Sequence, residues 1–209
     1  MKNKRNVLYS LIILAGVIYF PVQARQKNGD RTVVYQLDIK KSKLFWMAHK
    51  NEHNGFILFN SGTLSNFIDG WPTQGAFSIN MNSIRSTDET SATGRKRVEE
   101  ELKSPAFFTV PKYPAATIVV SRILPESNKT TFRVYGELTI KEVTKPIEFT
   151  AVMKQNGNTI TATANINITR ANWHTDPQQG PKSWNLFDGK DKHIDEQIPV
   201  RLELVFTKK

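Results

Sequence analysis

The segment TFRVYGELTI, residues 131–140, places an apolar or small side chain at every second position. One side of the segment consists of Phe132, Val134, Gly136, Leu138 and Ile140. The intervening positions carry charged or polar groups. Alternation with a period of two predicts a β-strand that buries one face and exposes the other. This segment therefore predicts a sheet whose apolar face is covered.

The same alternation recurs on both sides of this segment, and it sets the fold class. Strands are predicted at residues 33–39, 44–50, 55–60, 62–68, 77–81, 131–140, 146–153, 159–169 and 199–206. Short turns join them, and Gln155-Asn156-Gly157-Asn158 is the clearest hairpin signal. The chain is therefore all-β, either as an antiparallel barrel of about eight strands or as two sheets packed face to face.

The inward-facing side chains are mixed in size. Small residues at Gly136, Ala151, Ala162 and Ala164 accompany phenylalanines at 77, 132 and 149. Small inward residues leave volume unfilled. A barrel of about eight strands either fills its interior or holds one small ligand, and the alternation alone leaves both possibilities open.

One helix and one irregular segment interrupt the strands. Residues 95–102 predict a short helix, with Val98 and Leu102 on one face and opposite charges four residues apart. The stretch LKSPAFFTVPKYP, residues 102–114, follows directly and contains three prolines. Because proline lacks a backbone donor, this stretch cannot form a regular ladder. We expect a helical or irregular plug that packs its phenylalanines at one end of the barrel.

Two further regions have no strand pattern. Residues 1–24 have three cations, an apolar run and a small-residue cleavage site, which predicts a secretory signal peptide followed by a loose tail at 25–32. An uncleaved membrane anchor is the alternative. Residues 170–197 have weak periodicity but contain two tryptophans. They predict either a lid over the barrel or a packed crossover with a short helix.

Composition narrows the function classes. The chain has no cysteine, which excludes disulfides and thiol chemistry, and an exported chain without cysteine fits a bacterial periplasm or exterior. The net charge is +10. The cations are scattered rather than striped, so a solvated basic surface is expected and a nucleic-acid partner is not.

The residues that could carry chemistry do not form a recognised pattern. His49 and His53 are four apart on a strand-turn-strand segment, so their side chains need not converge on a metal. The acidic residues between 188 and 196 lack the ligand order of a calcium loop. The chain has neither a Gly-x-Ser-x-Gly turn nor a phosphate-binding glycine loop. We therefore expect no metal, no cofactor and no catalytic residues.

Besides residues 102–114, several short motifs follow one another along the chain. They are YQLD (35–38), SKLFW (42–46), HNG (53–55), GTL (62–64), NMNSI (80–84) and GELTIKEVTKP (136–146). In this order they resemble the motifs of the YceI-like family, which comprises exported bacterial proteins with a lipocalin-type barrel that bind polyisoprenoids. The resemblance runs from Tyr35 to Phe206 and is strongest at residues 102–114, where leucine, two phenylalanines and Lys-Tyr-Pro recur. Lys141 and Glu142 depart from the family pattern, because they fall where a glycine is common.

The resemblance implies that residues 33–209 form a lipocalin-like barrel that binds or carries a polyisoprenoid, an isoprenoid quinone or another long-chain lipid. Contact with a membrane would then be transient. The inward apolar positions and the plug supply the candidate cavity walls. These are Trp46, Phe77, Ile79, Met81, Phe107, Phe108, Phe132, Val134, Leu138, Phe149, Ile160, Ile166, Leu202 and Leu204. The candidate ligands of a polar head group are Lys103, Arg170 and His174.

Two other functions remain as alternatives. An envelope protein-interaction module would have a filled core and an exposed apolar patch. A hydrolase of a small amphiphile would bring Ser, His and Asp side chains together at a pocket. A lipid carrier would instead have an internal cavity lined by the residues named above.

Overall fold

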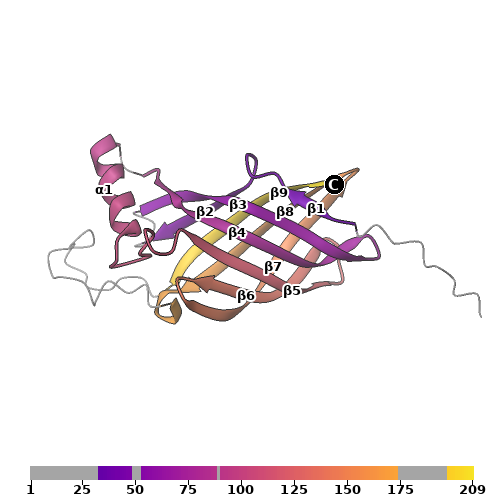
Figure 1. Cartoon of the computed structure of the whole chain (residues 1–209). Helices are drawn as coiled ribbons and strands as arrows, with labels where there is room; N and C mark the ends of the chain where they lie inside the picture. Colours follow the sequence, from indigo (N-terminus) through magenta and orange to yellow (C-terminus); the bar gives the residue numbers. More distant parts are fainter. Residues whose placement is uncertain (1–32, 49–52, 89, 174–196) are drawn as a thin grey trace, which may run out of the picture. The chain divides into compact units, whose positions relative to one another are not determined.

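The computed structural model describes residues 33–48, 53–88, 90–173 and 197–209 (Figure 1). The predicted signal peptide, the tail, His49 and His174 lie outside these residues. The first strands are β1 (Tyr35–Leu37), β2 (Lys43–Ala48), β3 (His53–Ile68) and β4 (Trp71–Ser86). After the helix α1 (Ala92–Lys103) come β5 (Ala115–Pro125), β6 (Thr131–Ile140), β7 (Val143–Asn156), β8 (Thr159–Thr169), the 3-10 helix η1 (Arg170–Trp173) and β9 (Gln197–Lys208).

The strands form one closed antiparallel barrel. From β3 to β9 each strand pairs with the next in sequence. Both β1 and β2 lie between β3 and β9. They follow one another along the barrel and together take the place of one strand. Tyr35 pairs with Leu64 and Lys208, whereas Leu44 pairs with Ile57 and Leu202. The nine strands therefore fill eight positions, which confirms the predicted barrel.

Strands β3, β4 and β5 differ most from the prediction. The segments predicted as strands at 55–60 and 62–68 belong to the single strand β3, which pairs with β4 across a register shift between Phe59 and Ser61. A bulge absorbs the extra residue that the sequence suggests is a turn. Strand β4 extends well beyond residues 77–81 at both ends. Strand β5 was not predicted, although Ala116, Ile118 and Val120 alternate with exposed residues.

The turn between β6 and β7 contains a lysine with a left-handed backbone conformation. Lys141 has a φ of 56°, in the left-handed region that side chains with a Cβ adopt at a cost. Glycine adopts this conformation freely, so Lys141 stands at a position where a glycine would be less strained.

Aromatic side chains pack against one another at the end of the barrel opposite α1. The Phe132 ring is fully buried and lies 4.8 Å from the ring of Trp71. Tyr35 stacks on Phe67 with a centroid distance of 5.2 Å. Because aromatic rings bury large areas and pair favourably, these contacts stabilise this end of the core.

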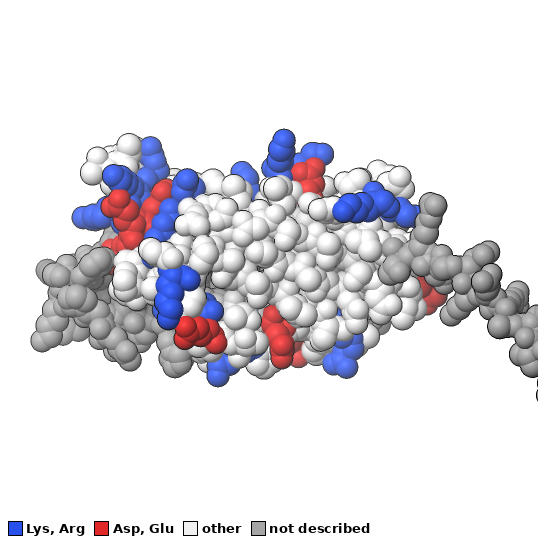
Figure 2. Space-filling view, viewed as in Figure 1, with Lys and Arg blue, Asp and Glu red and all other residues white. Residues whose placement is uncertain are grey.

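The visible outer surface carries charged side chains of both signs. Figure 2 shows cations interspersed with acidic side chains around α1, and a broad area without charged side chains over the middle of the strands. The exposed large apolar residues, such as Ile68 and Val119, are scattered over several strands. In the described part of the chain, no helix has the length and apolarity needed to cross a membrane.

Candidate functional site

Helix α1 and the plug, residues 104–114, lie at one end of the barrel (Figure 1). Ser91 caps the helix, because its Oγ accepts a hydrogen bond of 2.9 Å from the backbone N–H of Gly94. The helix buries Val98 and Glu101. It begins three residues earlier than predicted, at Ala92, and ends at Lys103.

The plug is irregular, as the prolines predicted. Hydrogen bonds between its backbone and the backbones of α1 and β4 hold it in place. The backbone N–H of Phe108 donates to the carbonyl of Leu102 at 3.2 Å, and that of Val110 donates to Lys103 at 2.9 Å. The N–H of Met81 in β4 donates to the carbonyl of Pro114 at 3.0 Å. Phe107 is buried and Phe108 is partly buried. The plug therefore carries its two phenylalanines to the barrel end.

A cavity of about 140 Å³ lies inside the barrel beneath the plug. We name it cavity 1. Strands β2 to β9 all contribute apolar side chains to its wall, and α1, the plug and η1 complete it. The lining residues are Leu44, Trp46, Ile57, Ile79, Met81, Ile84, Leu102, Phe107, Phe108, Ala116, Ile118, Leu138, Ile140, Ile147, Ile166, Ile168, Arg170, Ile198, Val200 and Leu202.

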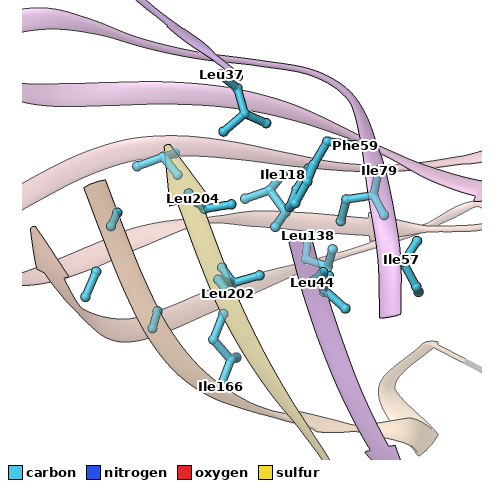
Figure 3. Close-up of a cluster of buried hydrophobic side chains, with 14 of the residues drawn as sticks. Leu37, Leu44, Ile57, Phe59, Ile79, Ile118, Leu138, Ile166, Leu202 and Leu204 are labelled. Atoms are coloured by element: carbon cyan, nitrogen blue, oxygen red, sulfur yellow. The ribbon is translucent and has the colours of Figure 1, made fainter. Parts of the chain in front are cut away.

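A second cavity, cavity 2, of about 50 Å³ lies further from α1. Its wall consists of Phe59, Leu64, Phe77, Ile118, Val120, Ile123, Val134, Phe149, Ala151, Met153, Ala162, Thr163, Ala164, Leu202, Leu204 and Phe206. Ile118 and Leu202 belong to both walls. Figure 3 shows these two side chains within the buried cluster, together with wall residues of both cavities.

The structure places most of the predicted apolar site residues on cavity walls. Cavity 1 receives Trp46, Ile79, Met81, Phe107, Phe108, Leu138, Ile166 and Leu202. Cavity 2 receives Phe77, Val134, Phe149, Leu202 and Leu204. Phe132 and Ile160 line neither cavity and are fully buried in the core. Alternation correctly assigned these two side chains to the inner face, but it could not show which inner positions pack against protein.

Many wall residues were not among the predicted site residues. Ala116 and Ile118 come from the strand that was not predicted, and Ile57 and Ile147 come from predicted strands. Leu102 extends from the last turn of α1. The alternation of residues 116–120 was the signal that could have identified the first pair.

The predicted head-group ligands have different positions. Arg170, in η1, is buried and lines cavity 1, with its guanidinium 5.7 Å from the centroid of the Phe107 ring. Trp173 holds η1 against β6, because its indole N–H donates to the carbonyl of Leu138 at 3.2 Å. Lys103 lines neither cavity. Burial and the neighbouring Arg85 lower its pKa.

Gly55 allows Trp46 to lie across the inner wall. A Cβ at position 55 would fall 2.6 Å from Cζ2 of Trp46 and 1.8 Å from the carbonyl oxygen of Arg85. No side chain with a Cβ can occupy that space without moving the backbone. The Trp46 Nε1 is buried and has no hydrogen-bond partner within the described residues. The indole therefore serves as a large, mainly apolar part of the wall of cavity 1.

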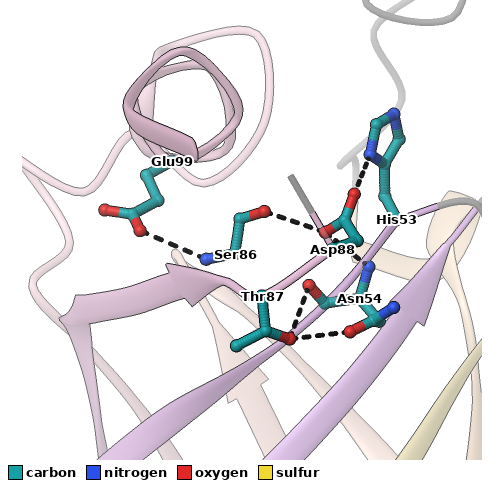
Figure 4. Close-up of polar contacts among 6 residues, drawn as sticks. All are labelled: His53, Asn54, Ser86, Thr87, Asp88 and Glu99. Atoms are coloured by element: carbon teal, nitrogen blue, oxygen red, sulfur yellow. Dashed lines mark hydrogen bonds and ion pairs between the residues drawn. The ribbon is translucent and has the colours of Figure 1, made fainter. Parts of the chain in front are cut away.

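A polar cluster links β3, the loop after β4 and α1 (Figure 4). Asp88 accepts hydrogen bonds from the Ser86 hydroxyl at 2.8 Å and from the Asn54 backbone N–H at 3.0 Å, and pairs with His53 Nδ1 at 2.7 Å. The Ser86 backbone N–H donates to Glu99 of α1 at 3.2 Å. Ser86 and His53 both bind the same carboxylate, so the hydroxyl does not donate to the imidazole as a nucleophile would. The cluster instead anchors α1.

Replacing Asp88 by asparagine is expected to remove an acid-sensitive part of the stability. Burial opposes ionisation of Asp88, but hydrogen bonds from Asn54, His53 and Ser86 outweigh it and lower its pKa. A carboxylate with a lowered folded pKa stabilises the fold above its unfolded pKa, and this contribution disappears as pH falls below about 4. In urea unfolding, wild type should be more stable than Asp88→Asn at pH 7, and the difference should shrink at pH 3.

Glu101 also makes the stability depend on pH, but it does not disturb the comparison between wild type and Asp88→Asn. Burial raises the pKa of Glu101, so its protonation favours folding in acid, with the sign opposite to Asp88. Because Glu101 is present in both proteins, its contribution cancels in the difference. A stability difference that stays constant from pH 7 to pH 3 would contradict the assigned role of Asp88.

The chain resembles several solved structures. BcnA of Burkholderia cenocepacia has 21% identity and a TM-score of 0.64, over 81% of this chain and 98% of the other. A polyisoprenoid-binding domain from Saccharophagus degradans, implicated in plant cell wall breakdown, has 16% identity and a TM-score of 0.60, over 84% and 98%. A YceI protein of Campylobacter jejuni has 17% identity and a TM-score of 0.51, over 75% and 81%.

These structural similarities establish a shared barrel fold. No curated protein matches the chain. The model of the YceI-like domain matches residues 35–206, which span the barrel, the plug and the walls of both cavities. This match confirms the resemblance that the motifs indicated, and the chain belongs to the YceI-like family.

Proposed function

We propose that this protein binds the apolar chain of a prenyl lipid, a polyisoprenoid or an isoprenoid quinone, inside its barrel. Cavity 1 carries the proposal, because it is an internal space whose described wall is apolar except for Arg170. The polyisoprenoid-binding domain from Saccharophagus degradans, which has the same fold, supports it. Binding would need no catalytic group, and the protein would act as a carrier in the periplasm.

The size of cavity 1 sets a condition on this function. A cavity of about 150 Å³ accepts one benzene-sized group, so 140 Å³ holds only a short piece of a prenyl chain. A longer chain requires wall side chains to change rotamer. Each buried CH₂ contributes about 0.8 kcal/mol before ordering and rearrangement costs, so affinity depends on how much of the chain the barrel buries without displacing its own side chains.

The two alternative functions fit the structure less well. An interaction module with a filled core does not account for the apolar space beneath the plug. A hydrolase needs its serine, histidine and acid at a pocket, and His53, Ser86 and Asp88 line neither cavity. Lipid binding uses the features that these alternatives leave unexplained.

Native mass spectrometry of the purified protein, followed by organic extraction, tests the proposed function. We expect a bound prenyl lipid, or a complex when a prenol or a quinone is added. The matched comparison uses straight-chain alkanols of similar length, which separate prenyl recognition from general oil binding. A protein that carries no lipid and fails to bind added prenols and quinones would contradict the proposal.

Arg170 is expected to bind an anionic head group. Arg170 lines cavity 1 among apolar side chains, where a charge-assisted hydrogen bond to phosphate is strong. Arg170→Gln should weaken binding of farnesyl phosphate about tenfold and leave farnesol binding within about twofold. Lys103→Gln removes a cation from the same end but not from the wall, and should change neither. Equal losses for phosphate and alcohol would contradict this role.

A further inference from the structure

The two cavities follow one another along the barrel. On β9 the inward residues Ile198 and Val200 line cavity 1, and Leu204 and Phe206 line cavity 2. Leu202 lies between these pairs and belongs to both walls. The same order holds on β5, where Ala116 lines cavity 1, Val120 lines cavity 2, and Ile118 lies between them. The boundary between the cavities therefore lies at Ile118 and Leu202.

These two boundary residues come from opposite walls. In the closed strand order, four steps separate β5 from β9, which is half of the eight positions. Strands half a circuit apart face each other across the interior of a barrel. Ile118 and Leu202 are both buried, and Figure 3 shows both within the interior cluster. Their branched side chains thus enter the interior from opposite sides at one level.

The space beyond the boundary suits the end of an apolar chain. Three alanines, at 151, 162 and 164, line cavity 2 together with phenylalanines at 59, 77 and 149. No charged residue is among its described wall residues. A chain that filled cavity 1 could bury further carbons only by passing Ile118 and Leu202.

We propose that Ile118 and Leu202 form a constriction that limits the length of prenyl chain that binds with full affinity. This inference rests on the proposed function and specifies which chains it accepts. A short chain fills cavity 1 and stops at the constriction. A longer chain must displace these two side chains from their packed rotamers, and this cost offsets the gain from burying its last isoprene unit.

The test compares two matched substitutions on one strand. Leu202→Ala opens the constriction, whereas Leu204→Ala removes the same atoms from the wall of cavity 2 alone. Affinities for geraniol, farnesol and geranylgeraniol are measured for wild type and both variants. In wild type the affinity should rise with the length of the prenol only until the chain reaches the constriction. Leu202→Ala should extend the rise by one isoprene unit, with about tenfold tighter binding of the longer prenol, and Leu204→Ala should keep the wild-type limit.

The possible outcomes separate this inference from the proposed function. If affinity stops rising at the same prenol length in Leu202→Ala and Leu204→Ala, the proposed constriction is wrong. Failure of wild type to bind any of the three prenols would overturn the proposed function as well. Should Leu202→Ala fail to fold, Ile118→Val removes one methylene from the same boundary at a smaller cost in stability. It should favour the longer prenol by a smaller factor, and an unchanged length dependence in a folded Ile118→Val would also overturn the inference.

Discussion

Replacing Ala116 by phenylalanine is expected to abolish binding of prenyl lipids while the barrel stays folded. Ala116 lies on β5, is buried, and contributes to the wall of cavity 1. The added ring is about the size of the group that a cavity of about 140 Å³ accepts. It would therefore occupy the space that the lipid needs. Losing the burial of five or six carbons corresponds to roughly 4 kcal/mol, or about a thousandfold in affinity.

Thr117→Phe is the matched control for this substitution. Thr117 is the next residue on β5 and is exposed on the outer face. The Thr117→Phe protein should bind prenols as wild type does, because the added ring lies outside the barrel. Binding is measured by titration with farnesol, and folding is monitored by circular dichroism. Tight binding by a folded Ala116→Phe protein would mean that the lipid does not occupy cavity 1.

Phe132→Ala is expected to cause the largest loss of stability. The Phe132 ring is fully buried, lies 4.8 Å from the Trp71 ring and borders neither cavity. Removing a buried phenylalanine ring costs about 3–5 kcal/mol, because it loses the transfer free energy and leaves a void. For a domain of this size the melting temperature should fall by roughly 10 °C. Thermal unfolding by circular dichroism measures it.

Phe45→Ala provides the comparison for Phe132. The Phe45 ring is partly exposed and lies beneath the Arg201 guanidinium at 4.9 Å. Its loss should lower the melting temperature by much less. Below its melting temperature, Phe132→Ala should still bind farnesol. An unchanged melting temperature together with lost binding would mean that Phe132 contacts the ligand, as the sequence alone suggested.

The fold was largely predictable from the sequence because the barrel depends on a local pattern. Residues 131–140 and 159–169 alternate cleanly, and their faces in the structure are those that the alternation predicts. The prolines of residues 102–114 excluded a ladder, and that segment is irregular. Strand β3 was split in the prediction because a bulge and a turn have similar local sequences.

The candidate site was less predictable because a cavity depends on which side chains face each other across the barrel. Alternation assigned Phe132 and Leu138 to the same inner face, but only the closed topology places Leu138 on the wall of cavity 1 and Phe132 in the solid core. Ile118 and Leu202, which line both cavities, lie on β5 and β9, two strands far apart in sequence. The contact between His53 and Asp88 spans 35 residues and has no local signal.

Photo-crosslinking tests the central claim most directly. The protein is mixed with a prenol that carries a diazirine on its last isoprene unit, and the complex is irradiated. The attachment sites on the protein are then mapped by mass spectrometry. We expect attachment to residues of cavity 1, such as Met81, Leu138 and Ile166, and competition by unlabelled farnesol. Attachment confined to exposed apolar residues such as Val119 and Val152 would contradict binding inside the barrel.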